Sequence, residues 1–232
     1  MLAAFTMVVS GTIVNVAVPD VMGAYGVGQS EVQLLSTAFM ISMTTGQLLN
    51  AWVVAVVGQR WGFIGTLLFF FVGSLVAGFA DNFGMIVLGR VLQGAAAGVV
   101  QPLVMVTLFQ AYPEGKRGSA LGLYVMGLVG AASVGPPAGG LLIELFDWRY
   151  IFFAPLILVI IALPLGALFL PSVRSKNPPN FDWIGYILIC IALYCLMTAV
   201  SNGAREGWGS NHIVTLFIGG VTASIAFIQS QR

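Results

Sequence analysis

The chain has 232 residues, of which 7% are charged and 59% are hydrophobic, and its formal net charge is +1. A soluble domain has about 25% charged residues, so this composition excludes a soluble protein and predicts an all-α polytopic membrane protein. Two cysteines exclude a disulfide scaffold, and a near-neutral charge without a basic cluster excludes a nucleic-acid partner.

The apolar runs of the sequence predict about eight transmembrane helices, because a helix needs about 20 mostly apolar residues to cross a bilayer. The runs are residues 2–19, 32–57, 63–80, 83–109, 120–143, 151–170, 184–200 and 213–228. They do not alternate like the strands of an outer-membrane barrel, and the first run lacks the basic start and the cleavage site of a signal peptide.

Residues 171–182 (PSVRSKNPPNFD) form the longest polar stretch of the chain. A helix does not continue through their proline pair, so this stretch separates six predicted helices from two. We expect a six-helix bundle over residues 1–171, a cytoplasmic linker over 172–183 and two additional transmembrane helices over 184–232.

The basic residues predict the orientation of the chain, because Lys and Arg are enriched in cytoplasmic loops. With eight helices, one side of the membrane holds only Arg149 and Arg205. The other side holds Arg60, Lys116, Arg117, Arg174, Lys176 and Arg232. This second side is therefore predicted to be cytoplasmic, and both termini lie there.

Polar residues follow one face of the first two predicted helices. The second helix has Gln33, Thr37, Met40, Thr44 and Gln47 at intervals of four and three, and the first has Thr6, Ser10 and Asn15. A single Ser or Thr more often bonds a carbonyl of its own helix, but several polar faces favour a shared cavity. We expect this cavity to be lined by Asn15, Thr44, Gln47 and Gln101.

The connection at residues 58–62 (GQRWG) is long enough only for a tight turn between two helices. Its Arg60 is either an ordinary positive anchor on the cytoplasmic side or a partner for a helix C-terminus or a neighbouring loop.

Arg90 is a charged residue deep inside a predicted helix, where a guanidinium costs at least a few kcal/mol. Its side chain either extends toward the outer surface or faces a protein-lined or watery cavity. Gln93, Ala97 and Gln101 lie on the same side of the helix at about 100° per residue, and this polar stripe favours the cavity.

Small residues repeat at intervals of four in two predicted helices, at Gly94 and Gly98, and at Gly127, Ala131, Gly135 and Gly139. This spacing lets membrane helices approach closely, and static packing is its commonest use. Residues 135–140 (GPPAGG) also place two prolines inside a helix, which predicts a kink and suggests a gate, a hinge or a seal.

The sequence predicts no enzyme, no metal site and no cofactor. His212 lies at the edge of an apolar run, and the chain has no cluster of Cys, His and carboxylate side chains. No Asp or Glu lies deep in a predicted helix, although a proton relay through a membrane usually uses a buried carboxylate or His.

Several motifs resemble those of the major facilitator superfamily, in particular the N-terminal part of its fourteen-span drug:proton antiporters. The motifs are residues 12–19 (TIVNVAVP), 90–94 (RVLQG) with Gly98, 135–140 (GPPAGG) and 148–153 (WRYIFF). Residues 182–185 (DWIG) and 207–208 (GW) resemble the two additional helices of that branch. The likeness covers essentially the whole chain.

The resemblance implies roles for particular residues. It implies proton coupling for the motif that contains Arg90, Gln93, Gly94 and Gly98. It implies export rather than import for the motif that contains Gly135, Pro136, Gly139 and Gly140. It also identifies Gln59, Arg60 and Gly62 as positions of the cytoplasmic loop motif.

The chain departs from the family pattern at two positions that bear on coupling. Ser10 stands where the branch commonly has Asp, and Gln59 stands where the loop motif has its acid. Family members also have two six-helix halves, whereas this chain ends after the additional pair.

These observations predict part of a secondary transporter of the bacterial inner membrane that exports amphipathic organic compounds by proton antiport. Its expected partners are the lipid bilayer, a small amphipathic substrate, protons, and a missing C-terminal half or a second chain. The alternative is a non-transporting membrane module, a truncated half that binds or regulates a partner. The missing half and Ser10 favour this alternative.

Overall fold

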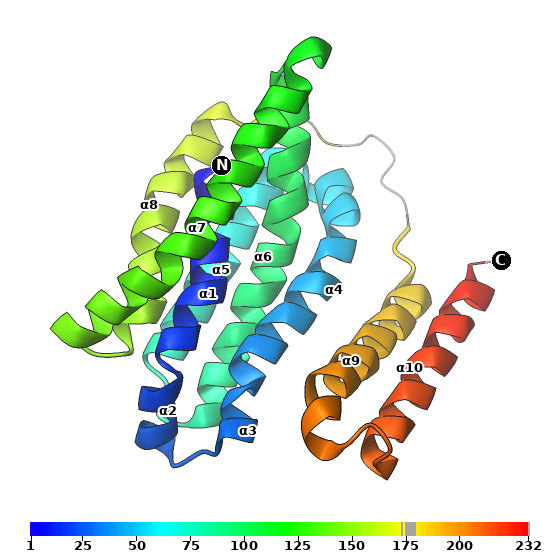
Figure 1. The fold of residues 1–232 in the computed structure, drawn as a ribbon. Helices are drawn as coiled ribbons and strands as arrows, with labels where there is room; N and C mark the ends of the chain where they lie inside the picture. The colour runs from blue at the N-terminus through cyan, green and yellow to red at the C-terminus, as the bar shows by residue number, and fades with distance from the viewer. Residues whose placement is uncertain (173, 175–179, 232) are drawn as a thin grey trace. The chain divides into compact units, whose positions relative to one another are not determined.

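The computed structural model describes residues 1–172, 174 and 180–231, and all regular elements in these residues are helices (Figure 1). The α-helices are α1 (Leu2–Ile13), α2 (Val18–Tyr25), α3 (Gln29–Val32), α4 (Leu34–Val57), α5 (Gln59–Gly78), α6 (Phe83–Ala111), α7 (Arg117–Leu145), α8 (Tyr150–Phe169), α9 (Trp183–Glu206) and α10 (Asn211–Ser230). Short 3-10 helices are η1 (Val14–Val16) and η2 (Glu114–Lys116). The all-α prediction is confirmed.

Among the described residues, seven helical segments are long and apolar enough to cross a membrane. An eighth span results if Leu2–Val16 and Val18–Tyr25, which are bent by 60°, are counted as one. The continuous helix expected over residues 2–19 is therefore wrong at its end. The helix breaks at Ala17, because Pro19 lacks a backbone N–H and restricts the residue before it.

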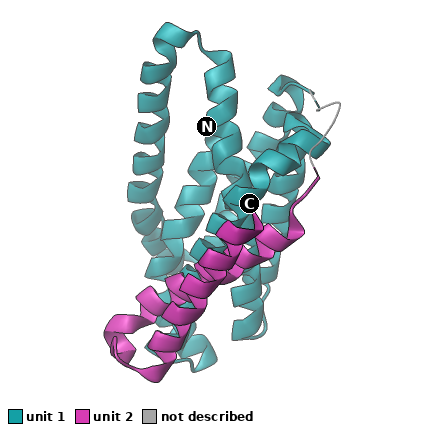
Figure 2. Ribbon diagram, turned by 90° about the vertical axis from the view of Figure 1, so that its right-hand side faces the viewer, with its two compact units in different colours: residues 1–178 teal, residues 179–232 magenta. Residues whose placement is uncertain are grey.

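The chain divides into two compact units, Met1–Pro178 and Pro179–Arg232 (Figure 2). The first unit contains α1 to α8, and the second contains α9 and α10. Residues 173 and 175–179 of the predicted linker lie outside the described residues. Lys176 and Arg232, which contribute to the predicted orientation, lie outside them as well.

Helix α6 packs against α4, α5 and α1 in the first unit, and α1 also packs against α7 and α8 (Figure 1). Consecutive spans of this unit alternate in direction. One end of the unit therefore holds the start of α1, the α4–α5 turn and the ends of α6 and α8, and we call it the Arg60 end. The opposite end holds the α5–α6 and α7–α8 connections, and we call it the Arg149 end.

Glycines bring α4 and α6 into close contact. A Cβ atom at Gly98 would lie 2.1 Å from the carbonyl oxygen of Met43, and one at Gly94 would lie 2.3 Å from that of Phe39. From the other side, a Cβ atom at Gly46 would lie 2.5 Å from the carbonyl oxygen of Ala95. No side chain larger than hydrogen fits at these positions, so the two backbones touch directly.

The second unit is a helical hairpin of α9 and α10. Gly220 of α10 faces the side chain of Leu196, and Gly203 of α9 faces the ring of Trp208. Asp182 caps the start of α9, where its side chain accepts a 2.9 Å hydrogen bond from the Gly185 amide. This bond, with a second one from the Gln231 side chain, lowers the pKa of the Asp182 carboxyl.

Candidate functional site

Arg90 lies on α6 with none of its surface exposed, so it does not extend toward the membrane surface. Its Nε donates to the carbonyl oxygen of Leu35 at 3.1 Å, and its Nη1 donates to the carbonyl oxygen of Ser10 at 3.0 Å. The ring of Phe39 covers the guanidinium, with 4.2 Å between Cζ and the ring centroid. Carbonyl dipoles and an aromatic face thus solvate the charge inside the protein.

Gln93 extends this arrangement to a further helix. Its Oε1 accepts from Nη1 of Arg90 at 2.9 Å, and its Nε2 donates to Oγ of Ser74 at 2.8 Å. Gln93 and Ser74 are fully buried like Arg90. The five residues Ser10, Leu35, Ser74, Arg90 and Gln93 therefore connect α1, α4, α5 and α6, and we call them the Arg90 network.

The Arg90 network contains no carboxylate. All eight acidic residues of the chain are described, and they lie at helix ends, in short helices or in connections. Within the described part of the chain, no acidic oxygen comes within 4.0 Å of Arg90, and its Nη2 atom has no hydrogen-bond partner. The guanidinium is consequently a buried cation without a counter-charge from these residues.

The four residues predicted to line a cavity have different surroundings. Asn15 is exposed in η1, where its Oδ1 accepts a 3.1 Å hydrogen bond from Oγ of Ser36 on α4. Thr44 is half-buried, and its hydroxyl donates to the carbonyl of Met40 in its own helix. Gln47 is exposed on α4, whereas Gln101 is half-buried on α6.

The glycine motif of α7 packs partly against α1. A Cβ atom at Gly135 would lie 2.1 Å from Oγ1 of Thr12, and one at Gly139 would lie 2.8 Å from Cγ1 of Ile13. Gly140 has open space on its Cβ side, and Pro136 is exposed. The motif thus combines a tight helix contact with an open face, and α7 remains one helix through both prolines.

The α4–α5 turn joins α4 and α5 at the Arg60 end, and its residues also contact α6 and the end of α8. Gln59 is buried and donates a hydrogen bond to the hydroxyl of Thr107 on α6. Arg60 donates from Nε to the carbonyl oxygen of Leu170 at 2.8 Å. Leu170 is the C-terminal cap of α8, so the pairing of Arg60 with a helix C-terminus is confirmed. Gly62 lies against Val53 of α4, which a Cβ atom would approach to 3.4 Å.

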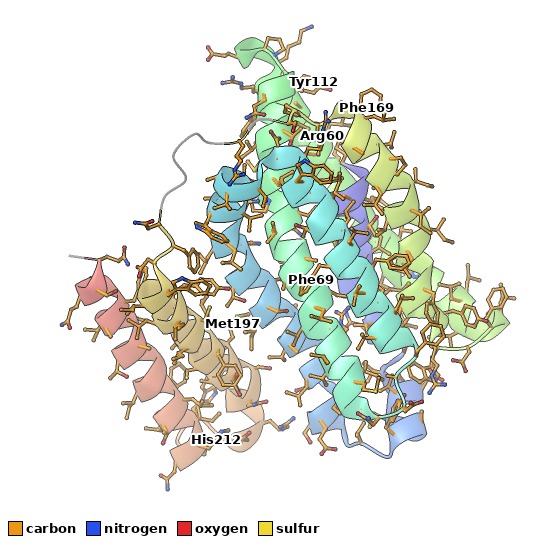
Figure 3. The ribbon with its side chains drawn as sticks, turned by 180° about the vertical axis from the view of Figure 1, so that it is seen from behind. Arg60, Phe69, Tyr112, Phe169, Met197 and His212 are labelled. Atoms are coloured by element: carbon orange, nitrogen blue, oxygen red, sulfur yellow. The ribbon has the colours of Figure 1, made fainter. Side chains whose placement is uncertain are left out.

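A cavity of about 350 Å³ that the sequence does not predict lies at the same end. Its lining includes Tyr112 and Phe169, which Figure 3 labels at this end of the unit together with Arg60. The lining comes from α1, α5, α6 and α8, and includes Leu2, Phe63, Leu103, Thr107, Ala162 and Phe169. These residues are ordinary apolar residues apart from Thr107, so no sequence pattern indicates the cavity.

Comparison with known proteins gives relatives over almost the whole chain. The chain is 33% identical to the puromycin resistance protein pur8 of Streptomyces alboniger, over 99% of this chain and 46% of that protein. It is 31% identical to the multidrug export protein EmrB of Haemophilus influenzae, over 98% of this chain and 45% of that protein. It therefore spans less than half the length of these curated relatives.

The fold is similar to that of solved transporters. The POT family transporter PepTSo matches 99% of this chain and 52% of its own chain, with a TM-score of 0.65 and 17% sequence identity. The model of the Major Facilitator Superfamily matches residues 1–229. These matches agree with the helical spans and the packing of the first unit, and the chain belongs to the Major Facilitator Superfamily.

Proposed function

We propose that this chain is the N-terminal part of a transporter that exports small amphipathic organic compounds. The observation that carries the proposal is the similarity over nearly the whole chain to proteins named for multidrug export and for puromycin and lincomycin resistance. Since those relatives are about twice as long, a second half would complete the transport path. The division at 1–171, 172–183 and 184–232 is part of this proposal.

We assign the transport path to the polar residues of α1, η1, α4 and α6. Asn15, Thr44, Gln47 and Gln101 are exposed or half-buried, which supports a role as lining residues. The contact of Gly135 and Gly139 with α1 supports a role for the α7 motif as a hinge or a seal when the halves of the transporter rock.

We further propose that export is driven by proton antiport. The support is the resemblance of the Arg90 motif to the one implicated in coupling, together with a charge at membrane depth. Arg90 is a fixed cation that would lower the proton affinity of a nearby site. Because the Arg90 network has no carboxylate, that site would belong to the rest of the transporter.

The Arg60 end of the first unit is proposed to face the cytoplasm. Arg60, Lys116, Arg117 and Arg174 belong to this end, whereas Arg149 belongs to the opposite one. In a variant without Cys190 and Cys195, we expect an impermeant thiol reagent added to whole cells to label Asp81→Cys and not Lys116→Cys. Labelling of Lys116→Cys alone would reverse the orientation.

An accumulation assay tests the export proposal. Cells that lack the protein should accumulate more of the neutral amphipathic dye Nile red than cells that express it. Equal accumulation of Nile red, ethidium and puromycin in the two strains would contradict export and favour a non-transporting membrane module.

A further inference from the structure

The charge of Arg90 lies one helix away from the proposed transport path. Its partners Ser10 and Leu35 belong to α1 and α4, and α4 also carries Thr44 and Gln47. Packed helices have axes about 8–10 Å apart. A substrate that contacts Asn15, which is hydrogen-bonded to Ser36 next to Leu35, would therefore pass within about 10 Å of the guanidinium.

Ser10 is the position at which α1 meets the guanidinium. Its carbonyl oxygen lies 3.0 Å and its Oγ 3.5 Å from Nη1 of Arg90. Ser10 is fully enclosed, and it lies in the last turn of α1, where the helix dipole already favours a cation. A carboxylate at this position would neutralise Arg90, and a hydroxyl does not.

We propose that Arg90 is an unneutralised positive charge that selects neutral and anionic amphipathic substrates against cationic ones, and that Ser10 leaves this charge unneutralised. The inference rests on the proposed export function. Three observations carry it: complete burial of Arg90, an Nη2 atom without a partner in the described residues, and acidic residues confined to the ends of the spans.

The size of the effect follows from Coulomb's law. Two unit charges about 10 Å apart, at an effective permittivity of about 20, interact strongly enough to change an equilibrium about tenfold. Salt screens this interaction little, because the protein and the bilayer separate the charge from water. The charge of Arg90 disfavours a cationic substrate on the path and favours an anionic one. The ratio of cation export to anion export therefore changes by at least about tenfold.

Ser10→Asp and Ser10→Asn form a matched pair for the test. The two side chains have nearly the same size and both bond to a guanidinium, but only Asp carries a charge. The probes are tetraphenylphosphonium and tetraphenylborate, which are hydrophobic ions of similar size and opposite charge. Export of each ion by the full-length transporter is normalised to export of Nile red by the same variant.

We expect the wild type and Ser10→Asn to prefer the borate, and Ser10→Asp to shift the ratio toward the phosphonium by at least about tenfold. Equal ratios in Ser10→Asp and Ser10→Asn, with Nile red still exported, would overturn the charge selection and leave the export proposal standing. A wild type that exports none of the three probes would overturn both.

A second pair keeps the test decisive if Ser10→Asp does not accumulate in the membrane. Its readout is the ratio of binding of the two ions to the purified full-length transporter, because binding does not need the proton coupling proposed for Arg90. Arg90→Lys keeps the charge and Arg90→Gln removes it. Only Arg90→Gln is expected to shift the ratio toward the phosphonium. The same ratio in both variants would again overturn the inference.

Discussion

At the scale of single residues, Gln93 explains how a guanidinium is retained inside the bundle. It accepts from Arg90 and donates to Ser74, so one side chain satisfies two buried groups. Removing such a partner leaves a buried charged donor without its acceptor, which costs more than an ordinary hydrogen bond.

We therefore predict that Gln93→Leu lowers the stability of the bundle by about 1.5–3 kcal/mol. Gln110→Leu is the control, because Gln110 is exposed on the same helix and its replacement should change stability by less than about 0.5 kcal/mol. Denaturant unfolding in detergent measures both variants. Equal loss in the two would show that the Arg90 network does not stabilise the fold.

The residues of the Arg90 network differ in how far the sequence predicts them. The depth of Arg90 and its shared face with Gln93 follow from helical spacing alone. The acceptors on Ser10 and Leu35 are backbone carbonyls of other helices, which every residue has, so no residue type indicates them. Of the protein-lined or watery surroundings that the polar stripe favoured for Arg90, the structure has the protein-lined ones.

At the scale of helices, glycines decide which pairs approach closely. Gly98→Ala should force α4 and α6 apart, because the added Cβ atom would meet the carbonyl oxygen of Met43, and we expect a cost of about 1–3 kcal/mol. Gly127→Ala on α7 has open space and should stabilise its helix by up to about 1 kcal/mol. The melting temperatures of the two variants measure this difference. A lower melting temperature for Gly127→Ala than for Gly98→Ala would contradict the close α4–α6 contact.

The cap of α9 gives a prediction about pH. The pKa of the Asp182 carboxyl is lowered by the hydrogen bond from Gly185, so the capping contribution is complete above the ordinary Asp pKa. It is lost as the pH falls through the lowered value. The protection of amides in the first turn of α9, which is the slowing of their hydrogen exchange relative to the intrinsic rate at each pH, should therefore fall at low pH in the wild type and should be low at all pH values in Asp182→Ala. Identical profiles would exclude a capping role.

Hydropathy predicts most spans, but the break after α1 shows its limit. Val14, Val16 and Val18 are as apolar as a helix requires, and among residues 14–19 only Asn15 and Pro19 depart from this pattern. The proline fits either the end of a span or a bend inside one, and the structure shows a bend of 60° with a second helix after it.

At the scale of the whole molecule, the chain supplies a bundle with a buried charge and polar faces, which we propose to form one side of a transport path. The family and the helical architecture were predictable, because motifs and apolar runs are local features of the sequence. The cavity at the Arg60 end was not, since four helices contribute unremarkable apolar residues to it.

The central claim is that the protein containing this chain exports amphipathic compounds at the expense of a proton gradient. The most direct measurement uses everted membrane vesicles with an acidic interior and follows the uptake of Nile red by fluorescence. We predict uptake that stops when a protonophore dissipates the gradient and that is absent from vesicles without the protein. Uptake that continues at full rate after the gradient is dissipated would contradict proton coupling, and equal uptake with and without the protein would contradict transport itself.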